Sequence, residues 1–582
     1  MLCRTANAAI GQKKSRFRSR IHAIPTACAT AGAARGEKRL FSKQIQATLT
    51  ERGTLLGECR LDQSKGKAPV SPMRANKGID MIKVKLGLTV AAICAATATW
   101  AGKADDTLKA AFTKELENVD SYFNSSREGV VLQRAIWDGL IYRDPATNEY
   151  KGNLATDWTW IDDTTLELKL REGVTFHNGE PFNADDVVYT VNFVADEANG
   201  VKTQRNVNWM KSAEKVDDYT VRILLKEPFP AAIEFLSGPV SMYPDEYYAE
   251  AGPTGMGLKP VGTGPYKVTE VVPGQHFVLE KNENYHDSPK GQPEIGKIDI
   301  RTIPDVNTQI AELFNGSLDL IWQTPADQAE KLAAMDQFTV ANESTMRIGY
   351  LTLDAAGRTG ADNPFTKLKV RQAVAHAIDR EALVSALLKG KSQVISTACF
   401  PSQFGCAQDV TSYEYDPEKA KALLAEAGYP DGFETDYYAY RDREYAEAIS
   451  SFLNAVGIKT NFNMLQYSAL RELRMKEGSP VSFQTWGSYS INDTSAITSQ
   501  FFKFGSLDDS RDQEIKDWLD VADSSTDPAE REEYYRKALQ KIADQAYWVP
   551  MFSYNTNYVF TKEVAYTPTP DEVLRFTTMR WN

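Results

Sequence analysis

The amino-acid sequence predicts a mixed α/β protein with two or more lobes. With 582 residues, the chain is too long for a single hydrophobic core, which rarely grows beyond about 250–300 residues. Segments of strand and helix character alternate from residue 105 onward, and no period of 20–50 residues recurs, so a solenoid is not expected. Hydrophobic residues make up 42% of the chain and charged residues 25%, which excludes a disordered or fibrous protein.

Strands are predicted where apolar and polar residues alternate. This alternation puts one face of a strand against a core and the other toward solvent. A further strand is expected to begin at Gly457, which marks the turn that precedes it. The four predicted strands cover residues 165–171, 220–225, 297–303 and 457–464.

Helices are predicted by capping residues and stop signals. Asn183 is placed to cap a helix whose first turn is acidic, which suits the helix dipole. A second helix has Asp416 as its N-cap, Pro417 in its first turn and Gly428 beyond its last turn. Further helices are expected over residues 306–315, 370–388, 450–456 and 528–546.

A secretory signal peptide is predicted over residues 81–101. Met81 is followed by two lysines, a short apolar run and small residues up to Ala101. The run is shorter than the roughly 20 residues of a membrane-spanning helix, and no amphipathic pattern favours the alternative of a buried helix. Because Ile93 rather than a small residue precedes Cys94, no lipid anchor is expected. We therefore predict a periplasmic protein.

Residues 1–80 differ from the rest of the chain in composition. They hold 16 Lys and Arg against 5 Asp and Glu and show little periodicity, so we expect no packed fold there. They are interpreted as a mis-assigned upstream start or a disordered leader, with a transit sequence as the alternative. Residues 102–582 carry a net charge of −25, which would repel phosphates, so no nucleic-acid partner is expected.

Two cysteines follow the predicted signal peptide. Cys399 and Cys406 flank Pro401 and Gly405, and an even pair in an exported protein favours a local disulfide that closes a loop. A metal site is the alternative, but it would need two more ligands, and no His is near in the sequence.

Five motifs occur in a fixed order over roughly residues 105–580. The longest spans residues 154–187 and contains His177-Asn-Gly-Glu-Pro-Phe-Asn183. The others are Pro260-Val-Gly-Thr-Gly-Pro-Tyr-Lys-Val268, Asn315-Gly-Ser-Leu-Asp-Leu320, Val370-Arg-Gln-Ala-Val-Ala-His-Ala-Ile-Asp-Arg380 and Tyr415-Asp-Pro-Glu-Lys-Ala-Lys-Ala-Leu-Leu-Ala-Glu-Ala-Gly428. Together they resemble the peptide/nickel-type solute-binding proteins of ABC transporters, family 5, which includes dipeptide- and oligopeptide-like periplasmic receptors.

The resemblance implies a two-lobed periplasmic-binding-protein clamp of type II, like those of the large cluster C, with an extra subdomain in lobe I. Lobe I would comprise residues 102–347 and 548–582, and lobe II residues 348–547. Two crossing strands, near residues 347–354 and 547–552, would form the hinge.

The partners implied by the resemblance are a small-molecule ligand and, on other chains, a membrane permease and ATPase subunits. The chain has no Gly-x-x-x-x-Gly-Lys-Ser/Thr loop that would hold nucleotide phosphates, which agrees with this division of roles. A monomer is expected.

Residue sets typical of enzymes are hard to find in the sequence. The histidines after residue 101 include no pair at helical metal-ligand spacing, and no Gly-x-Ser-x-Gly motif occurs. Acidic pairs such as Asp162-Asp163 fall where turns and caps explain them, and His177 lies in a motif that predicts a structural role. A distant carboxylate pair of glycosidase type stays open. We expect no enzyme, no cofactor and no metal.

Candidate ligand-binding residues in lobe II follow from the resemblance. In dipeptide-binding relatives, an Asp three residues after a Trp binds the ligand's ammonium group. Trp486 aligns with that Trp, but Tyr489 stands at the Asp position, and Asn492 stands at a second acidic position. Tyr offers an aromatic face and a hydroxyl rather than a counter-charge. Asp493 would take over the role if the loop is shifted by one residue.

Four further residues are candidates for the cleft. Arg441 and Arg443 lie in the loop that carries the carboxylate-binding Arg of relatives, and either could clamp a carboxylate or phosphate. The alternative is a solvated loop whose charges pair with one another. Tyr122 and Asn124 follow the first strand of the implied lobe I, and an aromatic face beside an amide suits peptides, opines and sugars. Trp137 is more typical of a core residue.

These observations predict a receptor that binds without catalysis. We expect it to capture a small polar ligand (a short peptide, an amino-acid conjugate or opine, or a glycoside) and to deliver it to an ABC importer. The alternative is a sensor or chaperone-like module on the same fold. A metal-chelate carrier is disfavoured because the chain has only 5 His.

Overall fold

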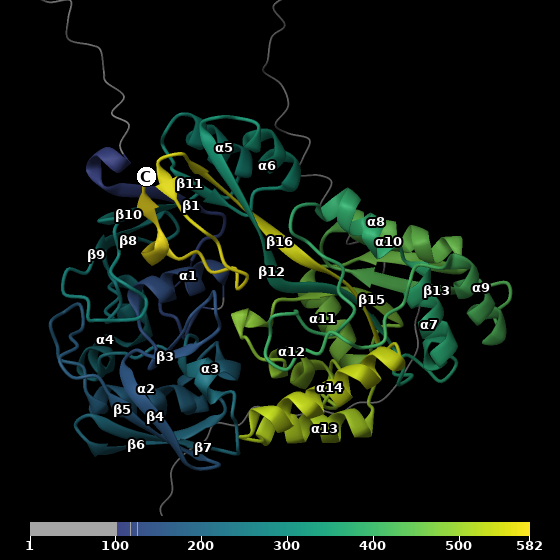
Figure 1. The fold of residues 1–582 in the computed structure, drawn as a ribbon, viewed down its shortest axis with the longest axis horizontal. Coiled ribbons are helices and arrows are strands. Elements are labelled where there is room, and N and C mark those ends of the chain that lie inside the picture. The colour runs from purple at the N-terminus through teal and green to yellow at the C-terminus, as the bar shows by residue number, and fades with distance from the viewer. Residues whose placement is uncertain (1–101, 117, 125) are drawn as a thin grey trace, which may run out of the picture. The chain divides into compact units, whose positions relative to one another are not determined.

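The structure is a computed structural model that describes residues 102–116, 118–124 and 126–582. The predicted leader (1–80) and signal peptide (81–101) lie outside the described residues, so both stay predictions. Within the described residues, strands and helices alternate along the chain, which confirms the mixed α/β class (Figure 1).

A ten-stranded mixed sheet contains strands from both ends of the described chain. Its order differs from the chain order, so segments distant in sequence become neighbours. Across the sheet, the strands are β14 (Ile458–Met464), β13 (Phe433–Ala439), β15 (Val481–Trp486), β12 (Phe338–Leu353), β16 (Trp548–Thr561), β11 (Leu320–Trp322), β1 (Thr107–Phe112), β10 (Lys297–Thr302), β9 (His276–Lys281) and β8 (Tyr266–Val272).

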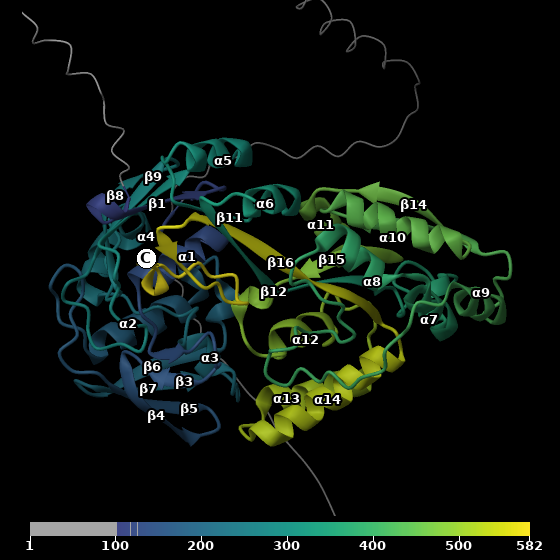
Figure 2. The same ribbon diagram turned by 45° about the horizontal axis from the view of Figure 1, so that its top comes forward.

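The two long strands β12 and β16 lie side by side at the middle of this sheet (Figures 1 and 2). They pair antiparallel from Phe338 opposite Thr561 to Thr352 opposite Trp548, with an irregular register after Ser344. These are the crossing strands expected near residues 347–354 and 547–552, and both are longer than expected. Almost every residue of β16 is buried, so the strand lacks the alternation that marks a half-exposed strand.

A separate four-stranded antiparallel sheet lies in the N-terminal half, as an extra subdomain would require. Its order is β4 (Ala155–Asp162), β5 (Thr165–Leu170), β7 (Thr220–Leu225) and β6 (Met210–Asp217). Two short pairs complete the strands: β2 (Ile141–Arg143) with β3 (Tyr150–Gly152), and β17 (Val564–Ala565) with β18 (Arg580–Trp581).

The helices divide between the two halves of the chain. The first half contains α1 (Arg127–Ile136), α2 (Ala184–Ala195), α3 (Ala232–Leu236), α4 (Asp245–Leu258), α5 (Val306–Phe314) and α6 (Ala326–Ala333). The second half contains α7 (Leu368–Ala377), α8 (Arg380–Leu383), α9 (Pro417–Glu426), α10 (Arg443–Ala455), α11 (Tyr467–Lys476), α12 (Ser495–Phe501), α13 (Gln513–Ser524) and α14 (Pro528–Asp544). The last two helices pack against each other, as both views show.

Separate hydrophobic cores give the two lobes their physical basis. Most of the first core comes from residues 108–300, with C-terminal residues such as Tyr558 and Phe576 added to it. The second and third cores come from residues 346–554. We call the elements around the first core lobe I and those around the second and third cores lobe II. A small fourth core packs Ala111 and Leu313 against Val559. Their sequence boundaries stay as predicted above.

The predicted elements agree with the structure except in one place. The strands expected over 165–171, 220–225 and 297–303 are β5, β7 and β10, and the helix capped by Asp416 is α9. The single helix expected over residues 370–388 is instead α7, then α8 capped by Asp379, then a π-helical turn. Asp379 accepts a hydrogen bond from the Ala382 amide at 2.9 Å, and this side-chain cap starts a new helix.

Cys399 and Cys406 are joined by a disulfide with a Cα–Cα distance of 5.9 Å. Cys399 is fully buried in the third core, and the partly buried Cys406 packs against that core. Among the described residues, no helix combines the length and the apolar character that crossing a membrane requires.

Candidate functional site

The loop formed by residues 487–493, directly after β15, has a strained backbone. Ser488, Tyr489 and Ser490 all have positive φ angles, of 47°, 51° and 65°. This left-handed region costs a residue other than Gly roughly 1–3 kcal/mol, so it persists only where surrounding contacts hold it. The 487–493 loop is therefore expected to have strong contacts on both sides.

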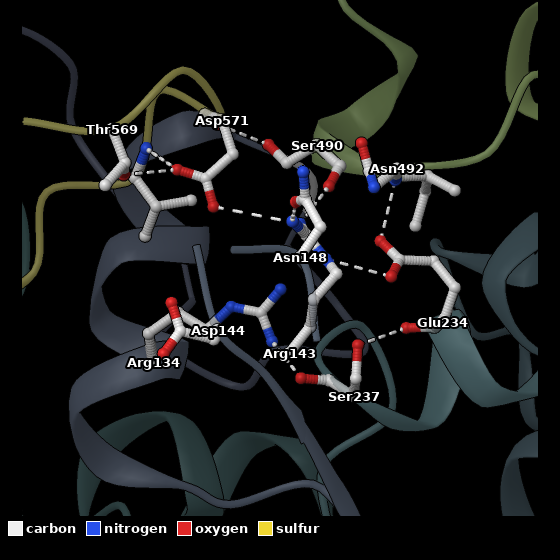
Figure 3. A network of polar contacts seen from close by, with 12 residues as sticks. Arg134, Arg143, Asp144, Asn148, Glu234, Ser237, Ser490, Asn492, Thr569 and Asp571 are labelled. Carbon is white, nitrogen blue, oxygen red and sulfur yellow. Dashed lines mark hydrogen bonds and ion pairs between the residues drawn. The ribbon is translucent and has the colours of Figure 1, made fainter. Parts of the chain in front are cut away.

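Lobe I supplies these contacts through polar side chains of three elements, of which Figure 3 shows Arg143 and Glu234 beside Ser490 and Asn492. Arg127, the first residue of α1, donates to Ser490 Oγ at 2.5 Å, and Arg143 at the end of β2 donates to the Ser490 carbonyl at 3.2 Å. Glu234 of α3 accepts the backbone N–H of Asn492 at 2.7 Å. The two lobes are thus joined directly at this loop.

Glu234 is the centre of a buried ion network. Its carboxylate lies 2.9 Å from Arg143 Nε and accepts the Tyr150 hydroxyl at 2.9 Å. Burial raises the pKa of Glu234, and Arg143 offsets part of that effect. On the other side of Arg143, Asp571 is buried but pairs with Arg575, which holds the pKa of Asp571 well below its usual range. Each of these buried charges therefore has a partner of opposite sign.

A cavity of about 550 Å³ lies beside the 487–493 loop and has walls from both lobes. From lobe I, the lining residues are Arg205, Asn206, Asn208, Glu227, Pro228, Phe229 and Phe235. From lobe II, they are Trp486, Tyr489, Ile491, Ser495, Ala496, Ser499, Gln500, Lys503, Asp520, Asp523 and Ser524.

A second cavity, of about 660 Å³, adjoins the first. The two cavities share four lining residues: Arg205, Trp486, Tyr489 and Gln500. The second cavity extends along α11, whose side chains Tyr467, Ser468, Arg471, Glu472, Met475 and Lys476 line it together with Leu507. Since they share walls, we treat them as one interlobe pocket with two halves.

Trp486 and Tyr489 form an aromatic corner between the two halves. Their rings are nearly perpendicular, at 88° with centroids 4.9 Å apart, and Trp486 Nε1 donates to the Ala496 carbonyl at 2.9 Å. The Arg205 guanidinium lies 3.4 Å from the Tyr489 ring centroid and 5.9 Å from that of Trp486. Tyr489 remains 38% exposed, so its ring is accessible from the pocket.

Asn492 and Asp493 are buried and do not line the interlobe pocket. Asp493 forms an ion pair with Arg531 of α14 at 2.8 Å and accepts the Ser495 hydroxyl at 2.6 Å. Its charge is already neutralised inside lobe II, which argues against a role in binding a ligand's ammonium group. Asn492 bonds Glu234 through its backbone, and its side-chain oxygen has no hydrogen-bond partner among the described residues.

Arg441 and Arg443 also lie outside the interlobe pocket. Arg441 pairs with Asp442 at 2.8 Å and lies 5.3 Å from the Tyr554 ring centroid. Arg443 begins α10 and pairs with Glu447 at 2.8 Å on an exposed surface. Arg441 thus pairs within its loop, as the alternative stated from the sequence has it, whereas the partner of Arg443 lies on α10.

Tyr122 and Asn124 make hydrogen bonds within lobe I. Tyr122 is 1% exposed, and its hydroxyl donates to the Ser241 carbonyl at 2.5 Å. Asn124 bridges the chain locally, because it donates to the Asn118 carbonyl and accepts the Ser126 amide. Trp137 is buried as well, as its core character predicts.

Two cationic residues of the pocket could not be predicted from the sequence. Arg205 lies in a short 3₁₀ turn of lobe I, and Arg471 lies on the exposed face of α11. Neither belongs to a motif, and only the tertiary structure brings both to one cavity. Among the described residues, no group of three or more His, Cys, Asp or Glu could hold a metal ion.

Comparisons with known proteins agree with this architecture. The chain is 28% identical over 452 residues to heme-binding protein A of Haemophilus influenzae, covering 72% of this chain and 81% of that protein. It is 28% identical over 449 residues to the glutathione-binding protein GsiB of Escherichia coli, covering 74% and 86%. The fold matches that of a dipeptide-binding protein from a Pseudoalteromonas species in complex with Met-Leu, with a TM-score of 0.68, 23% identity, and coverage of 82% of this chain and 100% of that one.

A second solved structure, HbpA2 from Haemophilus parasuis, matches with a TM-score of 0.71 and 24% identity, covering 82% of this chain and 100% of that one. These likenesses confirm the two-lobed fold. Residues 149–508 match the profile of the bacterial extracellular solute-binding proteins, family 5. The chain belongs to this family.

Proposed function

We propose that the protein is the extracytoplasmic receptor of an ABC importer, which binds a small polar ligand in the interlobe pocket without catalysing a reaction. Family membership supports this role, and the relatives named above bind glutathione, heme and a dipeptide according to their names. The ligand classes that fit are a short peptide, an amino-acid conjugate or opine, or a glycoside. The receptor would deliver its ligand to a permease driven by ATPase subunits on other chains.

The observation that carries this proposal is the aromatic corner of Trp486 and Tyr489 between two cavities with walls from both lobes. A ligand that contacts both walls stabilises the arrangement in which the lobes are close. We assign Trp486 and Tyr489 as ligand contacts. Of the other sequence candidates, Asp493, Arg441, Arg443, Tyr122 and Asn124 have protein partners that account for their side chains, and Asn492 lines neither cavity.

The proposed lobes are residues 102–347 with 548–582, and residues 348–547. We further propose that the mature protein is a periplasmic monomer, released by cleavage after residue 101. N-terminal sequencing of the exported protein tests this start.

Ligand binding is tested by a thermal-shift screen over dipeptides and tripeptides, opines and oligosaccharides. A ligand at 100 times its Kd stabilises a protein by about 2.7 kcal/mol, which is readily measured as a rise in Tm. Tyr489→Ala removes one wall of the aromatic corner and should weaken binding about 10-fold, the equivalent of ~1.4 kcal/mol.

Tyr415→Ala is the matched control, because Tyr415 is also exposed (46%) but lies away from both cavities. The control variant should bind as the wild type does. If no class of compound raises the Tm of the wild type, the receptor role is wrong.

A further inference from the structure

Two cations in the larger half of the interlobe pocket lack an acidic partner. Arg205 and Arg471 both line the cavity of about 660 Å³, and neither forms an ion pair with a carboxylate among the described residues. The third cation there, Lys476, is paired with Glu472 of the same helix at 2.6 Å. This half of the pocket therefore has an excess of positive charge.

The way Arg205 is held leaves its donors available. The Arg205 Cζ atom lies over the Tyr489 ring, 3.4 Å from its centroid, and this cation–π contact holds the group at the aromatic corner. A guanidinium has five N–H donors, so a contact with the Tyr489 side chain leaves others for a ligand. Arg205 can thus offer two parallel N–H donors to a carboxylate while it stays on the aromatic corner.

The acids of the smaller half do not neutralise this charge. Asp520 and Asp523 both pair with Lys503, each at 2.8 Å. Ser499 adds a hydrogen bond to Asp523 at 2.6 Å. Glu227 lines the cavity of about 550 Å³ and not the one that Arg471 lines. The two halves of the pocket therefore differ in charge, and the half along α11 is the positive one.

We propose that the interlobe pocket selects ligands that carry a carboxylate, which is held between Arg205 of lobe I and Arg471 of lobe II. This inference rests on the proposed receptor function and narrows its ligand class to acids such as peptides and opines, at the expense of neutral glycosides. Because the two cations come from different lobes, the carboxylate also bridges the lobes.

The test uses matched pairs of probes that differ only in the carboxylate. Met-Leu is compared with Met-Leu amide, and glutathione with its diethyl ester, by calorimetry on the full exported chain, with maltotriose as the neutral saccharide. We expect at least one acid to bind and its neutralised partner to bind about 10-fold more weakly or worse. Arg205→Gln and Arg471→Gln should each weaken binding of the acid about 10-fold and leave that of the neutralised partner unchanged.

Lys421→Gln is the control, since this cation is likewise paired on its own helix, with Glu418 at 2.8 Å, but lies outside both cavities. Arg205→Lys keeps the charge without the planar fork and should retain part of the affinity. Three results would refute the carboxylate site while the receptor function stands. They are equal binding of an acid and its neutralised partner, binding of the acid by both Gln variants as tightly as by the wild type, and binding of maltotriose alone. If the wild type binds none of the probes, the carboxylate site is refuted as well, and the wider screen above then decides whether the receptor function survives.

Discussion

His177 is held in a single tautomer by two backbone groups of one neighbouring segment. The amide of Gly262 donates to its Nδ1 at 3.3 Å, so Nε2 carries the hydrogen and donates to the Gly264 carbonyl at 2.9 Å. Burial lowers the pKa of His177 to about 4. These contacts agree with the structural role expected from its sequence motif, and they tie that motif to the segment containing the second motif.

The pKa of His177 predicts a pH-dependent stability. Between pH 6.5 and about 4, an unfolded His binds a proton that the folded one does not, so stability falls as pH decreases through this window. His177→Gln removes this contribution. Relative to the variant, the wild type should lose about 2 kcal/mol of unfolding free energy between pH 7 and pH 4.5. Urea unfolding at several pH values measures it, and parallel pH curves would contradict the assignment.

Helix ends were the elements most open to prediction from the sequence, because their signals are local. Asp416 caps α9 by accepting the Lys419 amide at 2.8 Å, and Asn183 caps α2 in the same way through the Asp185 amide at 2.7 Å. Strands such as β12 and β16 were harder, since their buried residues show no alternation, and their partners lie about 200 residues away. Only the resemblance to a known family indicated them.

The cap of α9 gives a prediction for one element. Asp416→Ala removes the acceptor for a helix N–H and should destabilise the protein by about 1 kcal/mol. Asp416→Asn keeps a good capping residue without the charge, so its stability should lie within a few tenths of a kcal/mol of the wild type. Urea midpoints at unchanged m-value provide the measurement. Equal losses in both variants would show that charge, and not capping, stabilises this end.

At the scale of the whole molecule, the lobes meet through side chains whose partners are hundreds of residues distant. Glu234 and Asn492 are 258 positions apart, and Arg127 and Ser490 are 363 apart. Sequence spacing has no information at this range, which is why Arg205 and Glu234 were not among the candidate residues. Trp486 and Tyr489 were found only because a family motif marks their loop.

The junction between the lobes predicts the behaviour of a Glu234 variant. In Glu234→Gln, the buried Arg143 loses the carboxylate at 2.9 Å and keeps only that of Asp571, which lies 4.0 Å away. The variant should therefore lose about 3 kcal/mol of unfolding free energy. The backbone N–H of Asn492 donates a hydrogen bond to Glu234. Its hydrogen exchange should therefore become faster in the variant.

Glu330→Gln provides the comparison for this variant. Its ion pair with Lys389 is exposed, so the cost should stay below about 0.5 kcal/mol. If the two variants lose equal stability, or if exchange in the 487–493 loop is unchanged in Glu234→Gln, the buried network does not hold the lobes together.

The position of β16 in the large sheet determines when lobe I can be completed during synthesis. β16 pairs with β12 along one edge and with β11 along the other, and it supplies Tyr558 and Phe560 to the first core. Until the ribosome has made residues 548–561, both neighbouring strands present unpaired edges, which are templates for association with other chains. A chain that stalls or is cleaved before residue 548 would therefore be prone to aggregation, although nearly all of lobe I has already been translated.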